Sequence, residues 1–370
     1  MDGEGFPGGS RKRVNKAGDR VREGAETNED YAVINEWRAA HRYVINTFQA
    51  SLRQRAKVAG DGIHVGQRLK RLNTILDKLE REPKMDLGRM DDVAGVRLIF
   101  PSVERLYEFR GQFHQAHFQH ERRSKDDQYD YIQRPKRNGY RGVHDIYAYR
   151  SKQSERAAGL FIEVQYRTLV QHAWATANEV VGYVTDSEPK FDRGDEHVRQ
   201  FMTVCSEILA RGLEGRYGPF PELPTSEVVE MFRDLDEATG VLRRLATLRV
   251  AKMDLPKRAH YILIFNREGQ LEIKEYDKNQ RALAALFKIE AQQPDSNVVL
   301  VGASTPEEMQ FTFRNYFSNT TDFIQMLHDA MRVIATTEDK AESTLQQLAN
   351  LAQADLISEP PRDEPEDSWP

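Results

Sequence analysis

Apolar residues recur every three or four positions over residues 29–57, and this spacing predicts an amphipathic helix. The stretch Gly60-Asp61-Gly62 ends that helix, and a second one is predicted over 63–81, before Pro83. The same spacing predicts further helices at 102–119, 168–184, 196–214 and 226–250.

Between these helices the spacing of apolar residues shortens to two positions, which is typical of β-strands. Residues 95–100 form a short apolar run, and residues 143–150 and 160–167 alternate between apolar and polar side chains. The polar face of the last strand carries Glu163, Gln165 and Arg167. The fold class predicted for residues 29–250 is therefore α+β, with a mixed sheet flanked by helices.

The pattern starts again after Pro256 and predicts a smaller ββαβα unit over 256–335. Its predicted elements are a hairpin at 260–277, a helix at 279–292, a strand at 297–303, and helices at 306–317 and 321–335. We predict that this unit is a separate accessory or regulatory domain, and that it gates a substrate cleft in the preceding domain.

Both ends of the chain differ in composition from the region between them. Residues 1–28 are rich in glycine and basic residues and are predicted to be a disordered tail. Residues 336–370 are predicted to form a helix followed by an acidic, proline-rich disordered tail.

Composition narrows the classes of protein and partner. The 370 residues, 39% of them hydrophobic, allow two or three domains. The net charge of −5 mixes both signs, so no DNA partner is expected. Cys205 is the single cysteine, which excludes internal disulfides and fits a reducing cytoplasm. The sequence contains no run of about 18 apolar residues, so we expect neither a membrane span nor a signal peptide.

Candidate chemistry gathers around a cationic loop and two carboxylates. The loop at 134–145, "RPKRNGYRGVHD", has the composition of phosphate-binding loops. Asp92 stands at the entry to one predicted strand and Glu163 lies on another. Taken singly, Asp92 suits a helix cap or turn, and Glu163 suits an exposed sheet edge. Together, carboxylates on neighbouring strand ends can hold Mg²⁺.

Four blocks of sequence, in this order, resemble the synthetase domain of the RelA/SpoT family, the ATP-dependent pyrophosphokinases that make the alarmones (p)ppGpp. They lie within residues 60–185 and read "GQRLKRLNTILDKL", "RMDDVAGVRLIF", "DYIQRPKRNGYRGVH" and "IEVQYRTLVQHAWA". The resemblance implies a nucleotidyltransferase-like fold, Mg²⁺ as cofactor, and ATP with GDP or GTP as substrates.

The resemblance also implies roles for single residues. Asp92 would be the principal Mg²⁺ ligand, and Glu163 would be either a second ligand or the base that prepares the acceptor 3′-hydroxyl. The ATP-binding residues would be Arg68, Lys70, Lys78 and Arg97, with Arg68 and Lys70 on the helix predicted at 63–81. The acceptor would be bound by Lys136, Asn138, Tyr140, His144, Gln165 and Arg167, and Tyr140 would stack on its base.

Several positions depart from the family pattern. Tyr129 stands where many members have lysine, Gly142 where many have serine, and Glu179 comes one position late. About 60 residues precede the four blocks and contain no His-Asp pair, so we expect a synthetase without a hydrolase domain.

Two alternatives remain open. A toxin of this family would transfer pyrophosphate to the 3′ end of tRNA, and Arg134, Arg137 and Arg141 would suit that polyanion. A catalytically silent nucleotide-binding module is the second alternative. The enzymatic hypotheses imply a role in growth control, as in stress response or phage defence. The sequence leaves open whether the chain forms a homo-oligomer or has an antitoxin.

Other candidates have ordinary structural explanations beside the functional ones. His144 could be a core histidine, although its place after the loop favours substrate contact. His114, His117 and His120 have a spacing that zinc could use, but a solvated helix face fits them better. Trp174 is predicted to pack its helix against the strand of Glu163.

Overall fold

The computed structural model describes residues 5–116, 118–150, 154–185, 194–247, 260–265, 271–293, 296–302 and 320–337. Its strands are β1 (His64–Leu69), β2 (Ala94–Phe100), β3 (Glu121–Arg122), β4 (Val143–Ala148), β5 (Phe161–Thr168), β6 (His260–Phe265), β7 (Leu271–Tyr276) and β8 (Asn297–Gly302). Its helices are α1 (Arg11–Arg22), α2 (Asn28–Ala59), α3 (Leu72–Arg81), α4 (Val103–His114), α5 (Leu169–Val184), α6 (Glu196–Glu214), α7 (Thr225–Thr239), α8 (Val241–Thr247) and α9 (Asn279–Gln292). Two 3₁₀ turns, Leu87–Arg89 and Glu155–Ala157, and a helix at 321–337 complete the described elements.

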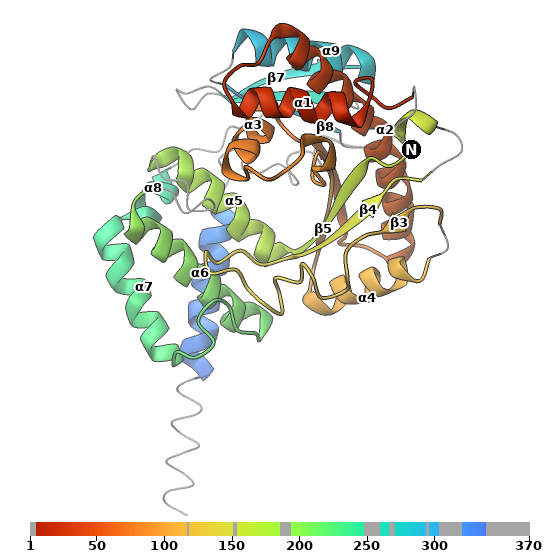
Figure 1. The fold of residues 1–370 in the computed structure, drawn as a ribbon. Helices are drawn as coiled ribbons and strands as arrows, with labels where there is room; N and C mark the ends of the chain where they lie inside the picture. Colours follow the sequence, from red (N-terminus) through yellow and green to blue (C-terminus); the bar gives the residue numbers. More distant parts are fainter. Residues whose placement is uncertain are drawn as a thin grey trace, which may run out of the picture.

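The described strands form one mixed sheet in the order β3-β4-β5-β2-β1-β8-β6-β7. Strands β2 and β5 run parallel, and the other neighbours are antiparallel. This arrangement confirms the predicted α+β class with a mixed sheet. Figure 1 shows the helices α5 to α8 gathered on one side of the strands, with α9 and β7 at the opposite end of the molecule from α4.

The two faces of the central strands differ in chemistry. One face carries apolar side chains such as Val65, Val96 and Val164, which share a core with Phe48 of α2 and Phe113 of α4. Burying this face stabilises the sheet, because each fully buried aliphatic side chain contributes about 1.5–3 kcal/mol. The other face carries polar side chains, among them Arg68 of β1 and Glu163, Gln165 and Arg167 of β5.

A second core joins the helices beside the sheet. Helix α6 is buried along most of its length and contributes Phe201, Cys205 and Ile208 to this core. Phe323 and Leu327 of the helix at 321–337 belong to the same core. Cys205 is a free, buried thiol, as the apolar surroundings of its helix predict.

Two predictions for the first 81 residues were wrong. Residues 11–22 form helix α1 instead of a disordered tail, because Ser10 caps it and Val14 and Ala17 pack into the core. Residues 64–69 form strand β1 instead of the start of a helix. The alternation of buried Val65 and Leu69 was obscured by the polar Gln67 between them, and pairing with β2 fixes the extended backbone.

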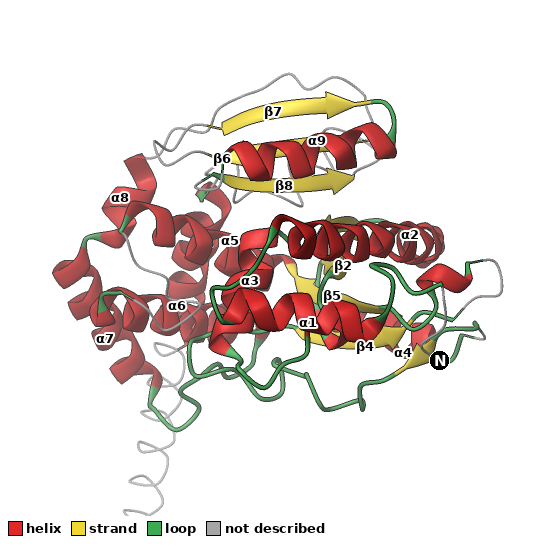
Figure 2. Cartoon of the chain, turned by 45° about the horizontal axis from the view of Figure 1, so that its top comes forward, coloured by secondary structure: helices red, strands yellow, loops and turns green. Residues whose placement is uncertain are grey.

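The predicted C-terminal hairpin, helix and strand are present as β6, β7, α9 and β8. However, β8 pairs with β1 through Gln67↔Gly302 and Arg68↔Val301, so these strands extend the main sheet. Figure 2 shows the three strands and α9 stacked beside α2. The structure therefore does not confirm a separate ββαβα domain. The helix predicted at 306–317 and the segment at 338–370 lie outside the described residues.

Among the described helices, none combines the length and the hydropathy that crossing a bilayer requires.

Candidate active site

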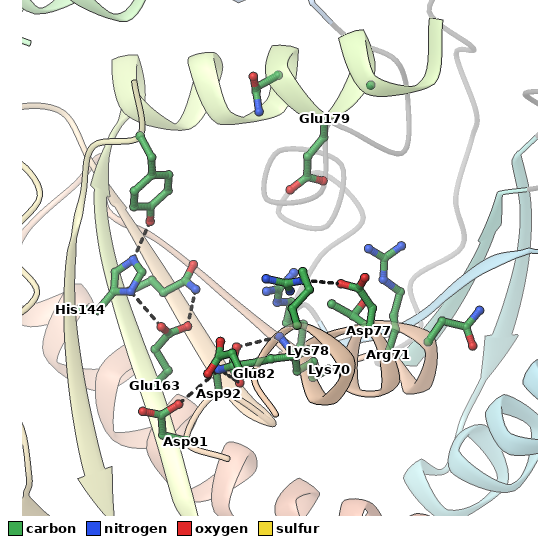
Figure 3. A pocket seen from close by; sticks show the side chains of 18 of the residues that line it. Lys70, Arg71, Asp77, Lys78, Glu82, Asp91, Asp92, His144, Glu163 and Glu179 are labelled. Atoms are coloured by element: carbon green, nitrogen blue, oxygen red, sulfur yellow. Dashed lines mark hydrogen bonds and ion pairs between the residues drawn. The ribbon is translucent and has the colours of Figure 1, made fainter. Parts of the chain in front are cut away.

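A cavity of about 860 Å³ opens on the polar face of the sheet, between strands β1, β4 and β5 and helices α3 and α5 (Figure 3). Eleven of the twelve residues predicted to bind substrate or metal line it: Arg68, Lys70, Lys78, Asp92, Lys136, Asn138, Tyr140, His144, Glu163, Gln165 and Arg167. The cavity therefore unites the cationic loop with both carboxylates.

The register of the strands explains how distant residues meet. Glu163, Gln165 and Arg167 alternate along β5 and share one face. Across the ladders, His144 of β4 lies opposite Gln165, and Gly95 of β2 lies opposite both Glu163 and Arg68 of β1. Residues directly opposite one another project to the same side of a sheet, so these side chains form one continuous polar floor.

Asp92 is bound by two lysines. Its carboxylate lies 2.7 Å from Lys70 Nζ and 3.1 Å from Lys78 Nζ. Burial alone would raise the pKa of Asp92, but the two ammonium groups lower it below its usual value. The prediction that Arg68 and Lys70 lie on a helix was wrong, since Arg68 lies on strand β1 and Lys70 follows that strand before α3.

Asp91 also lines the cavity and was not singled out from the sequence. Its carboxylate is 3.7 Å from Lys78 Nζ. Burial raises the pKa of Asp91, and Lys78 offsets only part of that effect. The consecutive aspartates of "RMDDVAG" could have indicated a second carboxylate, but adjacent strand residues usually point to opposite faces.

Glu163, His144 and Tyr140 form a hydrogen-bonded chain at the other end of the floor. His144 Nδ1 lies 2.8 Å from Glu163 Oε1, and its Nε2 lies 2.5 Å from the Tyr140 hydroxyl. Arg167 donates to the same hydroxyl at 3.2 Å. This chain shows that His144 is a polar member of the site instead of an isolated core histidine.

Electrostatic interactions among Glu163, His144 and Tyr140 favour the charged form of each group. Burial would raise the pKa of Tyr140, but Arg167 and His144 lower it to about 7. Burial would lower the pKa of His144, but Tyr140 and Glu163 raise it to about 9. For Glu163, burial again opposes ionisation, and His144 brings its pKa well below the usual range.

Tyrosines supply the aromatic surface of the cavity. Tyr140 is only 7% exposed, so most of its ring is covered. Tyr131 also lines the cavity, and Lys136 Nζ lies 4.2 Å from its ring centroid. Tyr129, which departs from the family pattern, lines the cavity as well. Tyr131 was not singled out from the sequence, although "YDYIQ" places Tyr129 and Tyr131 shortly before the loop.

The turn before Tyr140 depends on Gly139. Its φ of 86° disfavours other residues, and a Cβ there would lie 2.9 Å from Trp174 Cζ2. Ser206 of α6 donates to the Gly139 carbonyl oxygen at 2.6 Å. Trp174 donates through Nε1 to the Met202 carbonyl oxygen at 2.7 Å and shares a core with α6, so this contact joins α5 to α6; its predicted packing against the strand of Glu163 stays a prediction. Helices α5 and α6 therefore hold the loop in place.

The three loop arginines have different surroundings. Arg141 is buried, donates to Ser206 Oγ at 3.1 Å and forms an ion pair with Glu214. Arg134 is exposed and lies 3.7 Å from the carboxylate of Asp127. Arg137 is exposed. The buried position of Arg141 is inconsistent with a grip on a polyanion.

Arg97 does not line the cavity. Its Nε donates to Gln165 Oε1 at 3.3 Å, and Arg97 lies directly opposite Gln165 in the β2–β5 ladder, so it projects to the same face of the sheet as the floor residues. Burial together with Arg167 and Arg68 lowers the pKa of Arg97 to about 9. A direct contact between Arg97 and substrate therefore stays a prediction.

Helix α5 forms the wall that faces the carboxylates, as Figure 3 shows for Glu179. Asn178 precedes it and also lines the cavity. The displacement of Glu179 by one position relative to the family pattern does not take it out of the site.

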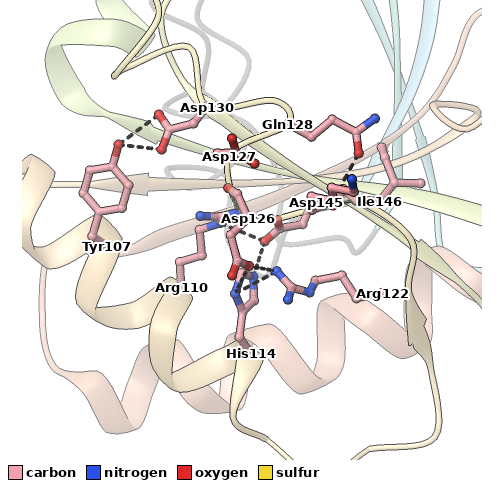
Figure 4. Close-up of polar contacts among 12 residues, drawn as sticks. Tyr107, Arg110, His114, Arg122, Asp126, Asp127, Gln128, Asp130, Asp145 and Ile146 are labelled. Atoms are coloured by element: carbon pink, nitrogen blue, oxygen red, sulfur yellow. Dashed lines mark hydrogen bonds and ion pairs between the residues drawn. The ribbon is translucent and has the colours of Figure 1, made fainter.

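A buried ion-pair network supports strand β4 from the opposite face of the sheet (Figure 4). Asp145 lies 2.7 Å from Arg110 Nη2 and 2.7 Å from His114 Nε2, both on α4. Tyr107 donates to both carboxylate oxygens of Asp130, at 2.9 Å each. These contacts anchor the strand of His144 and the segment before the cationic loop.

The histidines with zinc-like spacing have other partners. His114 belongs to the network just described, and the ring of His120 stacks on Phe48 with centroids 4.8 Å apart. His117 lies outside the described residues. Among the described residues, no three His, Cys, Asp or Glu side chains gather in a way that could hold a metal ion.

Comparisons with known proteins locate the family resemblance in this region. A family model described as "Region found in RelA / SpoT proteins" matches residues 67–188. The GTP pyrophosphokinases YjbM and YwaC of Bacillus subtilis are each 29% identical to this chain, over 118 residues (31% of this chain) and 138 residues (36%). The matched stretches span 54% and 64% of those two relatives, so the chain covers less than two thirds of either.

A solved structure is similar over a larger share of the chain. The crystal structure of the small alarmone synthetase 1 from Bacillus subtilis aligns with 55% of this chain and 95% of its own length, at 20% identity and a TM-score of 0.38. The family match covers the second half of β1 and all of α3, β2, β4, β5 and α5, and most residues that line the cavity lie within it. Residues 67–188 of this chain therefore contain the region found in RelA/SpoT proteins, and the relatives that align with this region are GTP pyrophosphokinases.

Proposed function

We propose that this chain is an ATP-dependent pyrophosphokinase that transfers the β,γ-pyrophosphate of ATP to the 3′-hydroxyl of GDP or GTP, giving (p)ppGpp. One observation carries the proposal: Asp92 and Glu163 face a single cavity whose floor and walls also supply lysines, arginines and tyrosines. Relatives named GTP pyrophosphokinase align with the same region and support it.

The reaction would need little covalent help from the protein. The acceptor oxygen bonds to the β-phosphorus, the bond from that phosphorus to the α,β-bridging oxygen breaks, AMP leaves, and the hydroxyl loses its proton. Such transfers depend on in-line positioning and on positive charge around the phosphates. Arg68, Lys70 and Lys78 would supply that charge at the ATP end of the cavity.

Asp92 and Glu163 would hold Mg²⁺. Mg²⁺ is usually bound by one or two carboxylates together with waters and substrate phosphates. Asp92 and Glu163 both line the cavity, so this pair of carboxylates fits that type of donor set. Lys70 and Lys78 keep Asp92 ionised, the form that binds a cation. Bound there, the metal would neutralise charge on the transferred phosphates.

The acceptor would occupy the end of the cavity formed by the cationic loop. Lys136, Asn138 and Arg167 would contact its phosphates and sugar, and the tyrosines would offer ring surface to the guanine base. His144 and Gln165 would orient Glu163, which they contact. Glu163 would then serve as a metal ligand or as the base that accepts the hydroxyl proton.

A guanine nucleotide is favoured over tRNA as the acceptor. Of the three arginines that suggested a tRNA grip, Arg141 is buried against Glu214. A catalytically silent binding module would have no use for transfer chemistry, so a transfer assay separates it from both enzymatic hypotheses.

The test is a transfer assay with ATP labelled on its γ-phosphate and with Mg²⁺, offering GDP, GTP and bulk tRNA in parallel. We expect label on the guanine nucleotide, together with release of AMP. Label on tRNA alone would favour the toxin hypothesis, and no transfer at all would contradict the proposal.

Variants tie the activity to the cavity. Asp92→Asn and Glu163→Gln should each lower kcat by at least about 100-fold, because each removes a charge that acts in the transition state. Glu108→Gln on α4 is the control, since its side chain is exposed, pairs with Arg105 and does not line the cavity. Full activity in Asp92→Asn would contradict the assigned role.

A further inference from the structure

Helix α9 reaches the cavity through one carboxylate, that of Glu290. The Glu290 side chain is 7% exposed and contacts the guanidinium of Arg38 on α2 at 2.6 and 2.8 Å. The Arg38 side chain has no exposed surface. A buried ion pair is costly to break because the remaining charge keeps no partner. This pair therefore fixes the end of α9 against α2.

Arg38 also contacts Lys70, the residue that binds Asp92. Its Nε donates to the carbonyl oxygen of Lys70 at 2.8 Å, and the Lys70 amide donates to the Val93 carbonyl oxygen at 2.9 Å. The Lys70 ammonium group then binds Asp92 at 2.7 Å. One guanidinium thus links the carboxylate of α9 to the backbone of a lysine that contacts Asp92.

Glu290 also holds the start of helix α3. The N-cap residue, Arg71, makes no capping hydrogen bond with its side chain. Instead, the Leu72 amide donates to Glu290 Oε1 at 3.3 Å. A carboxylate at a helix N-terminus satisfies a free amide and interacts favourably with the helix dipole. Helix α3 in turn carries Lys78, the second lysine that contacts Asp92.

We propose that Glu290 is a positioning residue for the ATP end of the active site, setting Lys70 through Arg38 and Lys78 through the N-terminus of α3. This inference rests on the proposed function and extends it to a part of the chain outside the family match at 67–188. Gln293, Ser296 and Val298 line the same cavity, so the C-terminal segment is part of the site wall.

The test measures equilibrium binding of ATP and, separately, of GDP to the full chain by calorimetry. We expect Glu290→Ala to weaken ATP binding by about tenfold or more, the loss typical of removing a group that orients a binding residue. GDP binding should stay unchanged, because its proposed contacts lie on β4, β5 and the cationic loop. The ATP affinity of Glu290→Gln should lie between those of wild type and Glu290→Ala, since the carboxamide oxygen can still accept hydrogen bonds from Leu72 and Arg38.

Two further variants separate positioning from folding. The double variant Arg38→Met with Glu290→Leu replaces the buried pair by apolar side chains, an exchange that often preserves stability. We expect the double variant to fold but to bind ATP more weakly than wild type does. Glu207→Gln breaks another buried pair, with Arg211 on α6, at a residue that does not line the cavity. It should lower the thermal midpoint and leave ATP affinity unchanged.

The outcomes distinguish this inference from the proposed function. Wild-type protein that binds ATP, with Glu290→Ala and the double variant binding it equally well, would overturn the positioning role alone. Equal loss of ATP and GDP binding in the double variant would also overturn it, because that result indicates general damage to the fold. Wild-type protein that binds no ATP would overturn the proposed function and the inference together.

Discussion

His41 shows how one buried residue makes the stability of the fold depend on pH. Its Nδ1 donates to the Trp37 carbonyl oxygen at 2.9 Å, and the two rings pack edge to face. Burial lowers the pKa of His41 to about 4. Between pH 6.5 and about 4 the unfolded chain therefore binds a proton at this position that the folded chain does not. The free energy of unfolding should fall as pH drops through that window, by roughly 3 kcal/mol in total from this group.

Urea unfolding at pH 7, 6, 5 and 4.5 measures the effect. His41→Gln should be less stable than wild type at pH 7, and its stability should fall less steeply with decreasing pH. His328→Gln is the control, because the His328 side chain is 64% exposed. Parallel pH profiles for wild type and His41→Gln would contradict the assignment.

Single residues also decide how far the sequence could predict the site. Asp92 stands at the entry to β2 and Glu163 alternates along β5, so residue type and position in the pattern identify both, and both line the cavity. Glu290 was not predictable in the same way. It is one of many glutamates on helices, and its partners Arg38 and Leu72 are 252 and 218 residues away in the chain. A contact at that separation leaves no periodic signal in the sequence.

Elements with strong periodicity were predicted well, and elements defined by their neighbours were not. Helix α2 and strand β5 could be predicted from the sequence because their buried residues recur at regular spacing along the whole element. Strand β1 contains only six residues and carries Gln67 on its buried face, so its extended backbone depends on pairing with β2 and β8. Local sequence could not supply those partners.

At the scale of elements, Asp145 joins strand β4 to helix α4. The carboxylate is fully buried, and it satisfies Arg110 and His114 together. Asp145→Asn should lower the free energy of unfolding by about 3–5 kcal/mol, because Arg110 keeps its charge without a charged partner. Denaturant titration measures this change.

Glu108→Gln on the same helix provides the comparison. Its ion pair with Arg105 is exposed on both sides, so the change should cost at most about 1 kcal/mol. Equal stability losses in the two variants would contradict the role of Asp145 as a buried anchor.

At the scale of the whole molecule, the C-terminal segment completes structures that begin elsewhere in the chain. Strand β8 covers the edge of β1, and the helix at 321–337 fills a core shared with α6. A chain ending at residue 255 would expose the unpaired edge of β1 and leave Phe201 and Ile208 partly uncovered. We expect that chain to aggregate or to melt well below the full chain, because exposed strand edges and apolar patches promote association.

The comparison is a chain ending at residue 337, which keeps every described strand and helix. Differential scanning calorimetry and light scattering on both truncations measure the outcome. A monodisperse 1–255 chain that melts with the full chain and binds ATP equally well would show that the C-terminal segment is a separable domain. In that case a gate over the cleft would be the better explanation of its place beside the cavity. Aggregation of the shorter chain alone would instead mean that the sheet is one folding unit from β3 to β7, with the active site built across it.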